Sequence, residues 1–308
     1  MMRLLPAGAV LVLCLSAWGQ LACPGAELRR PLPAVRRVVI FCVDGLSPDC
    51  LLRAEAPVLH GLLREGAGTL MARTVPAAVT LPAHVSMLTG AAPGKHRIEW
   101  NDDPPTGVSG YPAVPTIFEL ATRAGYTTAL VVGKPKLVAL CRPGTVAYPV
   151  ILRGAEATDA NVSAEAAKII AGHRPDLLFL HFPGVDGAGH TYGWGSPEQL
   201  AAIAAADAQI GAVLAALERS GLRQSTVIIV TADHGGEGLA HGSDVPGSQV
   251  IPWLVAGPGV RRGRDLAGPG GTAVRIEDTA ATASWLLGLE LPASSDGRPV
   301  TAAFATGG

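Results

Sequence analysis

The feature that most constrains the fold of this chain is a series of five short, largely apolar runs separated by helical patterns. Strands that are apolar on both faces and alternate with helices are typical of a parallel sheet covered on both sides. The predicted strands are Val38–Val43, Thr127–Val132, Leu177–Phe182, Val227–Thr231 and Ile251–Val255. The sequence therefore predicts an α/β fold, a three-layer sandwich whose central sheet is mostly parallel, with helices on both faces.

The segments between these runs carry helical patterns, and one of them has a clear start signal. Ser196 suits an N-cap, Pro197 suits the first helical turn, and Gln199 completes a capping box. The predicted helices are Ala56–Glu65, Pro82–Leu88, Thr116–Ala124, Ala164–Ala171, Pro197–Ser220 and Ile276–Leu287. Because no internal repeat and no long linker interrupts this alternation, residues 36–308 are expected to form one domain.

Composition supports a substantial core and argues against one class of partner. Hydrophobic residues make up 48% of the 308 residues, which is ample for a core of this size. The net charge is −1, so the chain lacks the basic field that is typical of nucleic-acid binding. The expected partner is a small molecule and not a nucleic-acid polymer.

The N-terminus has the pattern of a secretory signal peptide. A charged start is followed by an apolar stretch from Leu4 to Trp18 and then by small residues. The stretch is shorter than a comfortable membrane span, so residues 1–23 are predicted to be a leader, and any membrane contact requires that it stays uncleaved. The protein is therefore expected to be exported, to the periplasm or the medium. A lipid anchor at Cys23 has little support, because Gln20 stands where an aliphatic residue is usual.

Aspartates and histidines of the metal-binding type follow the predicted strands. The set is Asp44, Asp186, His190, Asp233, His234 and His241. Asp44 and Asp233 come directly beyond two of the strands, where ligands gather in α/β sheets, and Asp186 follows a third strand by four residues. Oxygen and imidazole ligands without a thiolate suit zinc or manganese in a hydrolytic site. Six such ligands are enough for two divalent ions, a pair that suits in-line displacement at phosphorus.

The aspartates and histidines lie in short sequence segments whose order extends along the whole mature chain. The segments are Val43–Leu46, Thr80–His84 continuing to Gly90, Asp186–His190, Thr231–Gly235, His241-Gly242, Ile251–Val260 and the tail from Leu286 to Gly297. In this order and spacing, the chain resembles the alkaline phosphatase superfamily, nearest to its type I phosphodiesterase/nucleotide pyrophosphatase branch. The resemblance implies an alkaline phosphatase-like fold and a phosphoric ester hydrolase.

The resemblance also assigns roles to individual residues. It implies that Asp44, Thr80, Asp233 and His234 hold one metal ion and that Asp186, His190 and His241 hold the other. The expected ions are zinc, with manganese as the alternative. Thr80 would be the nucleophile and would form a phosphothreonine intermediate. Its expected place just before a helix start agrees with this role, because helix N-termini favour phosphate groups.

Departures from the branch concern the substrate. Ala83 stands where the phosphodiesterases carry a phosphate-binding asparagine, whereas Asn101 and Lys134 stand near the phosphate-binding residues of related threonine-dependent alkaline phosphatases. The positive charge of Lys134 or Lys136 would suit a phosphate monoester, which carries one more negative charge than a diester. Phosphodiester or nucleotide-type substrates are favoured from the branch, with an alkaline phosphomonoesterase as the alternative. Since a long insertion of the nucleotide pyrophosphatases is missing before His241, substrate recognition is expected mainly from residues 90–160.

The same residues allow other interpretations. A sulfatase of this fold would need a Cys-x-Pro-x-Arg sequence, which the segment Cys50–Arg53 does not match. A catalytically silent metal-binding domain is the non-enzyme alternative, and the intact Thr80 argues against it. Taken alone, Asp44 could cap a turn and His241 could lie in an exposed loop. The histidines expected to be surface or structural are His60, His96, His173 and His181, and His84 is expected to orient the Thr80 loop without binding metal.

Overall fold

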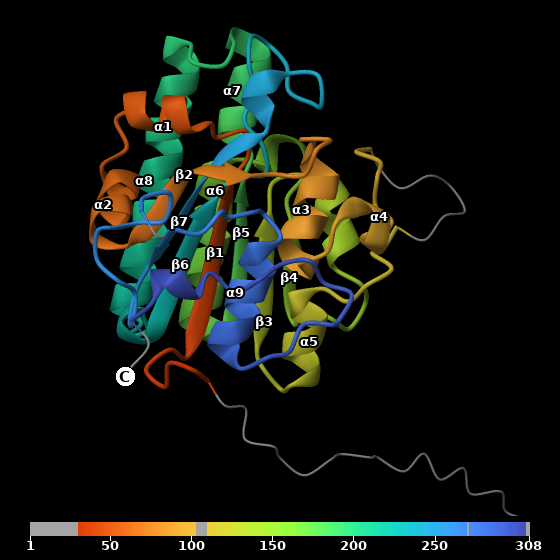
Figure 1. Ribbon diagram of the computed structural model, residues 1–308, viewed down its shortest axis with the longest axis vertical. Helices are drawn as coiled ribbons and strands as arrows, with labels where there is room; N and C mark the ends of the chain where they lie inside the picture. Colours follow the sequence, from red (N-terminus) through yellow and green to blue (C-terminus); the bar gives the residue numbers. More distant parts are fainter. Residues whose placement is uncertain (1–29, 103–109, 270, 306–308) are drawn as a thin grey trace, which may run out of the picture.

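A computed structural model describes residues 30–102, 110–269 and 271–305. The predicted leader and Cys23 lie outside these residues. The described chain forms one eight-stranded sheet in the order β4-β3-β5-β1-β6-β7-β2-β8 (Figure 1). The strands are β1 Arg37–Val43, β2 Ala67–Arg73, β3 Thr128–Val132, β4 Tyr148–Ile151, β5 Leu177–Phe182, β6 Thr226–Thr231, β7 Val250–Ala256 and β8 Arg264–Asp265. The α/β fold predicted from the apolar runs is confirmed.

Most of the sheet is parallel, as predicted, and one strand is reversed. β4, β3, β5, β1 and β6 run parallel to one another, and β8 is parallel to β2, whereas β7 is antiparallel to both β6 and β2. The central strand β1 pairs with β5 and β6, so that Val43 lies opposite Phe182 and Cys42 lies opposite Thr231. The residues that follow these three strands therefore emerge together at one edge of the sheet.

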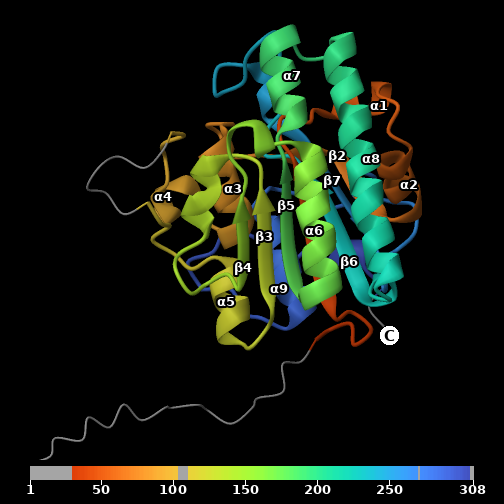
Figure 2. The ribbon, with the colours of Figure 1, turned by 180° about the vertical axis from the view of Figure 1, so that it is seen from behind.

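Helices cover both faces of the sheet. α6 and α8 pack together on the face seen in front in Figure 2, and α9 lies on the other face with α3 and α5 beside it (Figures 1 and 2). The helices are α1 Pro48–Arg53, α2 Pro57–Glu65, α3 Thr80–Thr89, α4 Pro93–His96, α5 Ile117–Arg123, α6 Asp159–His173, α7 Gly184–Tyr192, α8 Pro197–Arg219 and α9 Asp278–Leu287. This is the expected three-layer arrangement.

The five strands with apolar runs were predicted within a residue or two, and three others were not. β4 contains Pro149 and is short, and β8 has only two residues. β2 includes Gly68 and exposes Met71, so neither alternation nor a continuous apolar run marks it. These strands take their conformation from pairing with neighbours more than from their own sequence.

The segment around Asp186 forms α7, which is not among the helices predicted from the sequence. Its three glycines, Gly184, Gly187 and Gly189, have low helix propensity. The helix α7 packs along α8, and a Cβ at Gly184 would come within 2.6 Å of the Asp159 carboxylate. Tertiary packing therefore decides this helix, and glycine is required where the neighbours approach closely.

α8 is, among the described residues, the one helix long and apolar enough to cross a membrane by length and composition. Its residues Ile203, Ile210 and Val213 are buried, and the helix packs against α6 and α7. An apolar helix in this position is accounted for by the core of the domain.

The buried side chain of His96, at the end of α4, ties that turn to α3. Its Nε2 lies 2.9 Å from the hydroxyl of Ser86, and its Nδ1 accepts the backbone N–H of Ile98 at 3.1 Å. Because Nδ1 is an acceptor, protonation there breaks the bond to Ile98. Burial lowers the pKa of His96 to about 4.

We expect His96 to make folding less favourable in acid. Its pKa is about 4 in the folded chain and about 6.5 when unfolded, so the unfolded chain binds more protons between these values. Stability should fall as pH drops through this window, by on the order of 2–3 kcal/mol from this residue. His96→Asn keeps an acceptor for Ile98 but cannot titrate, so urea unfolding from pH 7 to 4 should show a weaker pH dependence than the wild type.

The control for this comparison is His173→Asn, which removes an exposed histidine at the end of α6. It should follow the wild-type pH dependence. Parallel curves for wild type and His96→Asn would contradict the assignment.

Candidate active site

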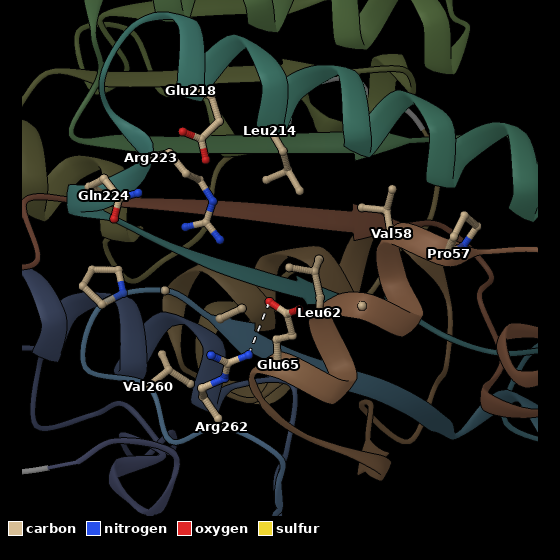
Figure 3. A pocket seen from close by; sticks show the side chains of 14 residues that line it. Pro57, Val58, Leu62, Glu65, Leu214, Glu218, Arg223, Gln224, Val260 and Arg262 are labelled. Atoms are coloured by element: carbon tan, nitrogen blue, oxygen red, sulfur yellow. Dashed lines mark ion pairs between the residues drawn. The ribbon is translucent and has the colours of Figure 1, made fainter.

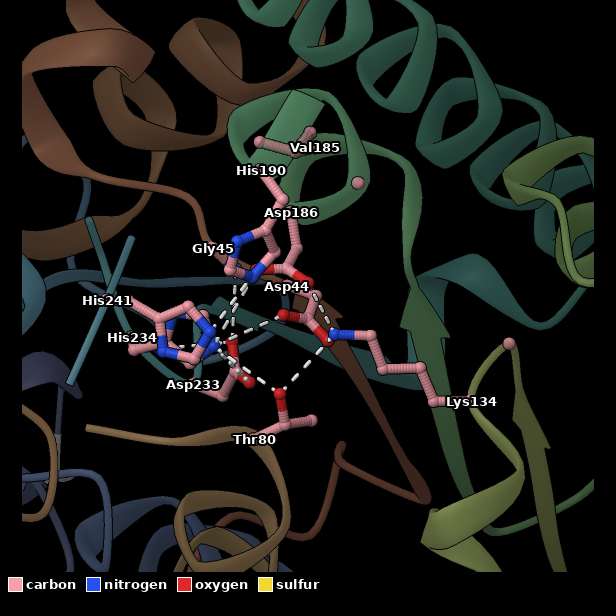
Figure 4. A network of polar contacts seen from close by, with 12 residues as sticks. Asp44, Gly45, Thr80, Lys134, Val185, Asp186, His190, Asp233, His234 and His241 are labelled. Atoms are coloured by element: carbon pink, nitrogen blue, oxygen red, sulfur yellow. Dashed lines mark hydrogen bonds and ion pairs between the residues drawn. The ribbon is translucent and has the colours of Figure 1, made fainter. Parts of the chain in front are cut away.

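Acidic and imidazole side chains meet at the edge of the sheet where β1, β5 and β6 end. Asp44 follows β1 directly, Asp233 lies two residues after β6, and Asp186 lies on the first turn of α7 beyond β5 (Figure 4). All three aspartates are buried. Gly45 turns the chain after β1 with a φ of 73°, which favours glycine, and its N–H donates to Asp233 Oδ1 at 3.1 Å.

One group of side chains contains Asp186, His190 and His241. Asp186 and His190 are four residues apart on α7, so they lie on the same side of the helix. The Nε2 atoms of His190 and His241 lie 3.4 and 3.8 Å from Asp186 Oδ1. The three ligand atoms are close enough together to hold one metal ion. This is the set that the sequence assigned to one of the two ions.

The second group surrounds His234. Its Nε2 lies 3.4 Å from Asp44 Oδ1, 3.3 Å from Asp233 Oδ2 and 4.0 Å from Asp186 Oδ1. The Thr80 hydroxyl is 3.5 Å from the same nitrogen. Asp186 is close enough to Asp44 and His234 to share a metal with them, so its carboxylate stands between the two groups. The sequence had assigned it to one side alone.

The histidines of both groups are held in the orientation that metal binding needs. The Nδ1 atoms of His190, His234 and His241 lie 3.0, 2.8 and 2.9 Å from the backbone carbonyls of Leu239, Gly235 and Ala78. A carbonyl only accepts, so each Nδ1 carries the proton and each Nε2 presents its lone pair to the carboxylates. Such carbonyl contacts commonly fix histidine ligands of metals.

The carboxylates of the two groups, like the histidines, are suited to binding cations. Among the described residues, Asp44 Oδ1, Asp186 Oδ1 and Asp233 Oδ2 are buried atoms without a hydrogen-bond partner. An unpaired buried carboxylate oxygen is costly unless a cation compensates it. Together with three inward nitrogen atoms, these oxygens suit two divalent ions of the zinc or manganese type.

Lys134, just beyond β3, is bound to two of these aspartates. Its Nζ lies 2.7 Å from Asp44 Oδ2, 2.6 Å from Asp186 Oδ2 and 3.4 Å from the Thr80 hydroxyl. Burial alone would raise the pKa of Asp44, but Lys134 and a hydrogen bond from His181 hold it well below its usual range. The carboxylates in turn raise the pKa of Lys134 against the effect of burial. Lys134 is thus a fixed positive charge beside the Thr80 hydroxyl.

His181 was predicted to be a surface or structural histidine, and it instead contacts the site directly. It lies in β5 and is fully buried. Gly133 donates its N–H to Nδ1 at 3.2 Å, so Nε2 is the donor to Asp44 Oδ2 at 2.8 Å. The available signal was a single polar residue within an apolar strand, at the position before its last residue.

The Thr80 segment differs slightly from expectation. Thr80 is the first residue of α3 and does not precede it, and its side chain is buried. Asn101 accepts the N–H of Leu81 at 2.9 Å and so caps this helix end. His84 lies one turn further, with Nδ1 donating to the Thr80 carbonyl at 2.8 Å. Burial lowers the pKa of His84 to about 4.

A separate hollow of about 740 Å³ lies between α2, α8 and the loop after β7 (Figure 3). Gln224, before β6, and Gly257, after the reversed strand β7, line it, so it reaches the opposite end of the sheet from Asp44. Glu65 and Arg262 within it form an ion pair at 3.9 Å. Among the described residues, the groups of possible metal ligands lie at the strand ends and not in this hollow. The site at the strand ends is therefore the stronger candidate for the active site.

Comparison with known proteins identifies the family to which the chain belongs. The family described as "Type I phosphodiesterase / nucleotide pyrophosphatase" matches residues 38–246, a span that contains every metal ligand predicted from the sequence. The human GPI ethanolamine phosphate transferase 2, catalytic subunit, is 26% identical over 281 residues, which are 87% of this chain and 28% of that protein. Alkaline phosphatase PhoD of Zymomonas mobilis is 32% identical over 83 residues, 27% of this chain and 14% of that protein. The chain spans less than a third of the length of these relatives.

Solved structures with the same fold extend the comparison. Murine ectonucleotide pyrophosphatase/phosphodiesterase 5, an inactive variant in complex with AMP, has a TM-score of 0.73 and 16% identity, covering 88% of this chain and 100% of that one. The phosphonate monoester hydrolase of Silicibacter pomeroyi has a TM-score of 0.63 and 18% identity, covering 86% and 75%. At such identities the likeness shows the fold, and it confirms the alkaline phosphatase-like architecture. With a family match over more than half of its length, the chain belongs to the type I phosphodiesterase/nucleotide pyrophosphatase family of metal-dependent hydrolases, within the alkaline phosphatase superfamily.

Proposed function

We propose that residues 36–308 form a two-metal phosphoric ester hydrolase that acts through a phosphothreonine at Thr80. The observation that carries this proposal is the position of the Thr80 hydroxyl against His234 and Lys134, beside three buried carboxylates with unpaired oxygens. Small phosphodiester or nucleotide-type substrates are favoured, in line with the family and with the AMP bound to the murine structure. Export through the leader remains part of the proposal.

Each residue has a defined task in this reaction. When bound, two divalent cations supply charge that activates a hydroxyl and stabilises the leaving oxygen. Thr80 Oγ1 loses its proton and attacks phosphorus, the bond to the leaving oxygen breaks, and the leaving alcohol takes up a proton while a phosphothreonine forms. Water then attacks that phosphorus and breaks its bond to Oγ1, which restores the threonine hydroxyl and releases a phosphomonoester from a diester, or inorganic phosphate from a monoester. The N-terminus of α3, held by Asn101, faces the phosphate with its positive end.

The alternative substrate class is a phosphomonoester, and one observation favours it. Lys134 lies 3.4 Å from the nucleophilic hydroxyl, where a cation would meet the additional charge of a monoester. Asn101 stands at the same helix end, while Ala83 offers no polar group. The effect of Lys134 on the rates of monoester and diester hydrolysis therefore distinguishes the two substrate classes.

Removal of the Thr80 hydroxyl should abolish turnover and spare metal binding. With p-nitrophenyl phosphate and bis-p-nitrophenyl phosphate, Thr80→Ala should lose on the order of a thousandfold or more in kcat, because no covalent intermediate can form. Thr80→Ser keeps a hydroxyl and should retain part of the activity. Both variants should still bind metal through the remaining ligands. Substantial turnover by Thr80→Ala would reject covalent catalysis, and no turnover by the wild type on any phosphate ester would favour the silent domain.

Metal content should match the two groups of ligands. The purified protein loaded with zinc and passed through a desalting column should carry close to two ions per chain, measured by elemental analysis. His190→Ala leaves Asp44, Asp233 and His234 in place and should retain close to one ion. A wild-type stoichiometry of one would exclude the two-metal site.

Lys134 should separate the two substrate classes. If the protein is a monoesterase, Lys134→Ala should slow monoester hydrolysis on the order of a hundredfold and diester hydrolysis much less, since one such contact is worth about that much. Lys136→Ala, two residues away, is the matched control and should change neither rate greatly. Metal content is measured in parallel, because Lys134 also contacts Asp44 and Asp186. Equal losses on both substrates would reject the monoesterase alternative.

A further inference from the structure

The indole of Trp194, just after α7, packs beside two of the metal-binding residues of the first group. Its ring stands edge-on to His190, with centroids 5.2 Å apart, and lies 6.0 Å from the ring of His241. These two histidines come from different segments, one from α7 and one from the loop after β6. One aromatic ring therefore limits the rotation of both.

The polar edge of the same indole is linked to the second group through Gly45. Trp194 Nε1 donates to the carbonyl of Gly45 at 2.8 Å, and the N–H of Gly45 donates to Asp233 Oδ1 at 3.1 Å. Asp233 Oδ1 also accepts the N–H of His234 at 3.0 Å, which leaves Oδ2 directed at the imidazole of His234. Trp194 thus holds the turn at Gly45, and the N–H of this turn orients the carboxylate of Asp233.

Three glycines make room for this ring. A Cβ at Gly236 would come within 2.2 Å of the indole, one at Gly189 within 2.9 Å and one at Gly45 within 3.2 Å. Distances under 3.0 Å require the ring or the backbone to move. The close fit on several sides leaves the indole a single position, and its backbone N–H is fixed to the carbonyl of Gly238 at 2.8 Å.

We propose that Trp194 is a positioning residue that holds both halves of the metal centre in one geometry. The inference rests on the proposed two-metal site. The ring packs against two histidines of one half, and its N–H fixes the turn that orients the aspartate of the other. Loss of the indole should therefore weaken metal binding at both halves, although Trp194 binds no metal itself.

Metal affinity is the first test. Zinc dissociation constants are measured by competition with a chromogenic chelator, on protein shown to be folded by circular dichroism. Trp194→Ala should raise them about 10- to 100-fold, the range typical of residues that orient metal ligands. Trp194→Phe restores a ring beside His190 but not the bond to Gly45, so it should recover part of the affinity. Trp285→Phe, which replaces a tryptophan that packs on Phe304, is the control and should behave like the wild type.

Tryptophan fluorescence gives a second readout. Zinc should change the emission of the wild type and of Trp285→Phe, and Trp194→Phe should lose that change, because the ring lies against two of the ligands. If the wild type binds two zinc ions and the Trp194 variants bind them with unchanged constants, the residue only packs and the inference is wrong. If the wild type itself binds no zinc, the proposed site fails instead.

A matched pair of glycine substitutions moves the ring without removing it. Gly189→Ala and Gly187→Ala both place a methyl group on α7 between Asp186 and His190, but only the methyl at position 189 meets the indole. Gly189→Ala should weaken zinc binding at least several-fold relative to Gly187→Ala, on the same scale as loss of an orienting contact. Equal affinities for the two variants would show that the position of the indole does not matter.

Discussion

The site depends on the burial of three carboxylates at one edge of the sheet. Asp44, Asp186 and Asp233 lie within a small volume from which water is largely excluded. Buried like charges repel one another strongly unless cations or hydrogen bonds compensate them. Neighbouring side chains compensate the negative charge of these carboxylates. Lys134 supplies a fixed charge, His181 donates to one carboxylate, and the three histidines with fixed Nδ1 atoms point nitrogen lone pairs at the space between.

The order of the strands brings these charges together. β1 lies between β5 and β6, and each strand is followed by one of the three aspartates within a few residues. A parallel arrangement sends all three to the same edge. The reversed strand β7 extends the sheet beyond β6 without adding a ligand to that edge. Thr80 then reaches the cluster from the N-terminus of α3, on the face covered by α9.

Sequence reasoning succeeded where local patterns are strong. The strands that carry the site are buried on both faces, so their composition alone marks them, and the aspartates beyond them follow from strand-end logic. It failed where tertiary contacts override local preference. Glycine-rich α7 is helical because α8 and Trp194 pack against it, and this places Asp186 and His190 on one side of a helix.

The missed residues share a physical cause. His181 is a polar residue in an apolar strand, and its role depends on the register that sets Cys42 opposite it, which no local pattern reveals. Trp194 lies outside the metal-binding motifs, and two of the three glycines that enclose its ring, Gly45 and Gly236, are distant from it in sequence. Local sequence periodicity does not reveal contacts between segments that are far apart in the chain. The types of the ligand residues and their order can be read directly from the sequence.

The separation of the site along the chain also bears on how the protein is made. Gly45 and Asp233, which share a hydrogen bond, are 188 positions apart, and Asp44 and His181 are 137 positions apart. During synthesis from the N-terminus, β1 emerges early, yet β6 and its aspartate come late. Until then β1 has an unpaired edge and Asp44 has no partner on that side, a state that invites wrong pairing. Asp186 and His190, by contrast, lie four residues apart on α7, so the packing of α7 against the neighbouring α8 is enough to bring them together. The site is therefore complete only once β6 has paired with β1, and chains that end before β6 lack Asp233 and His234.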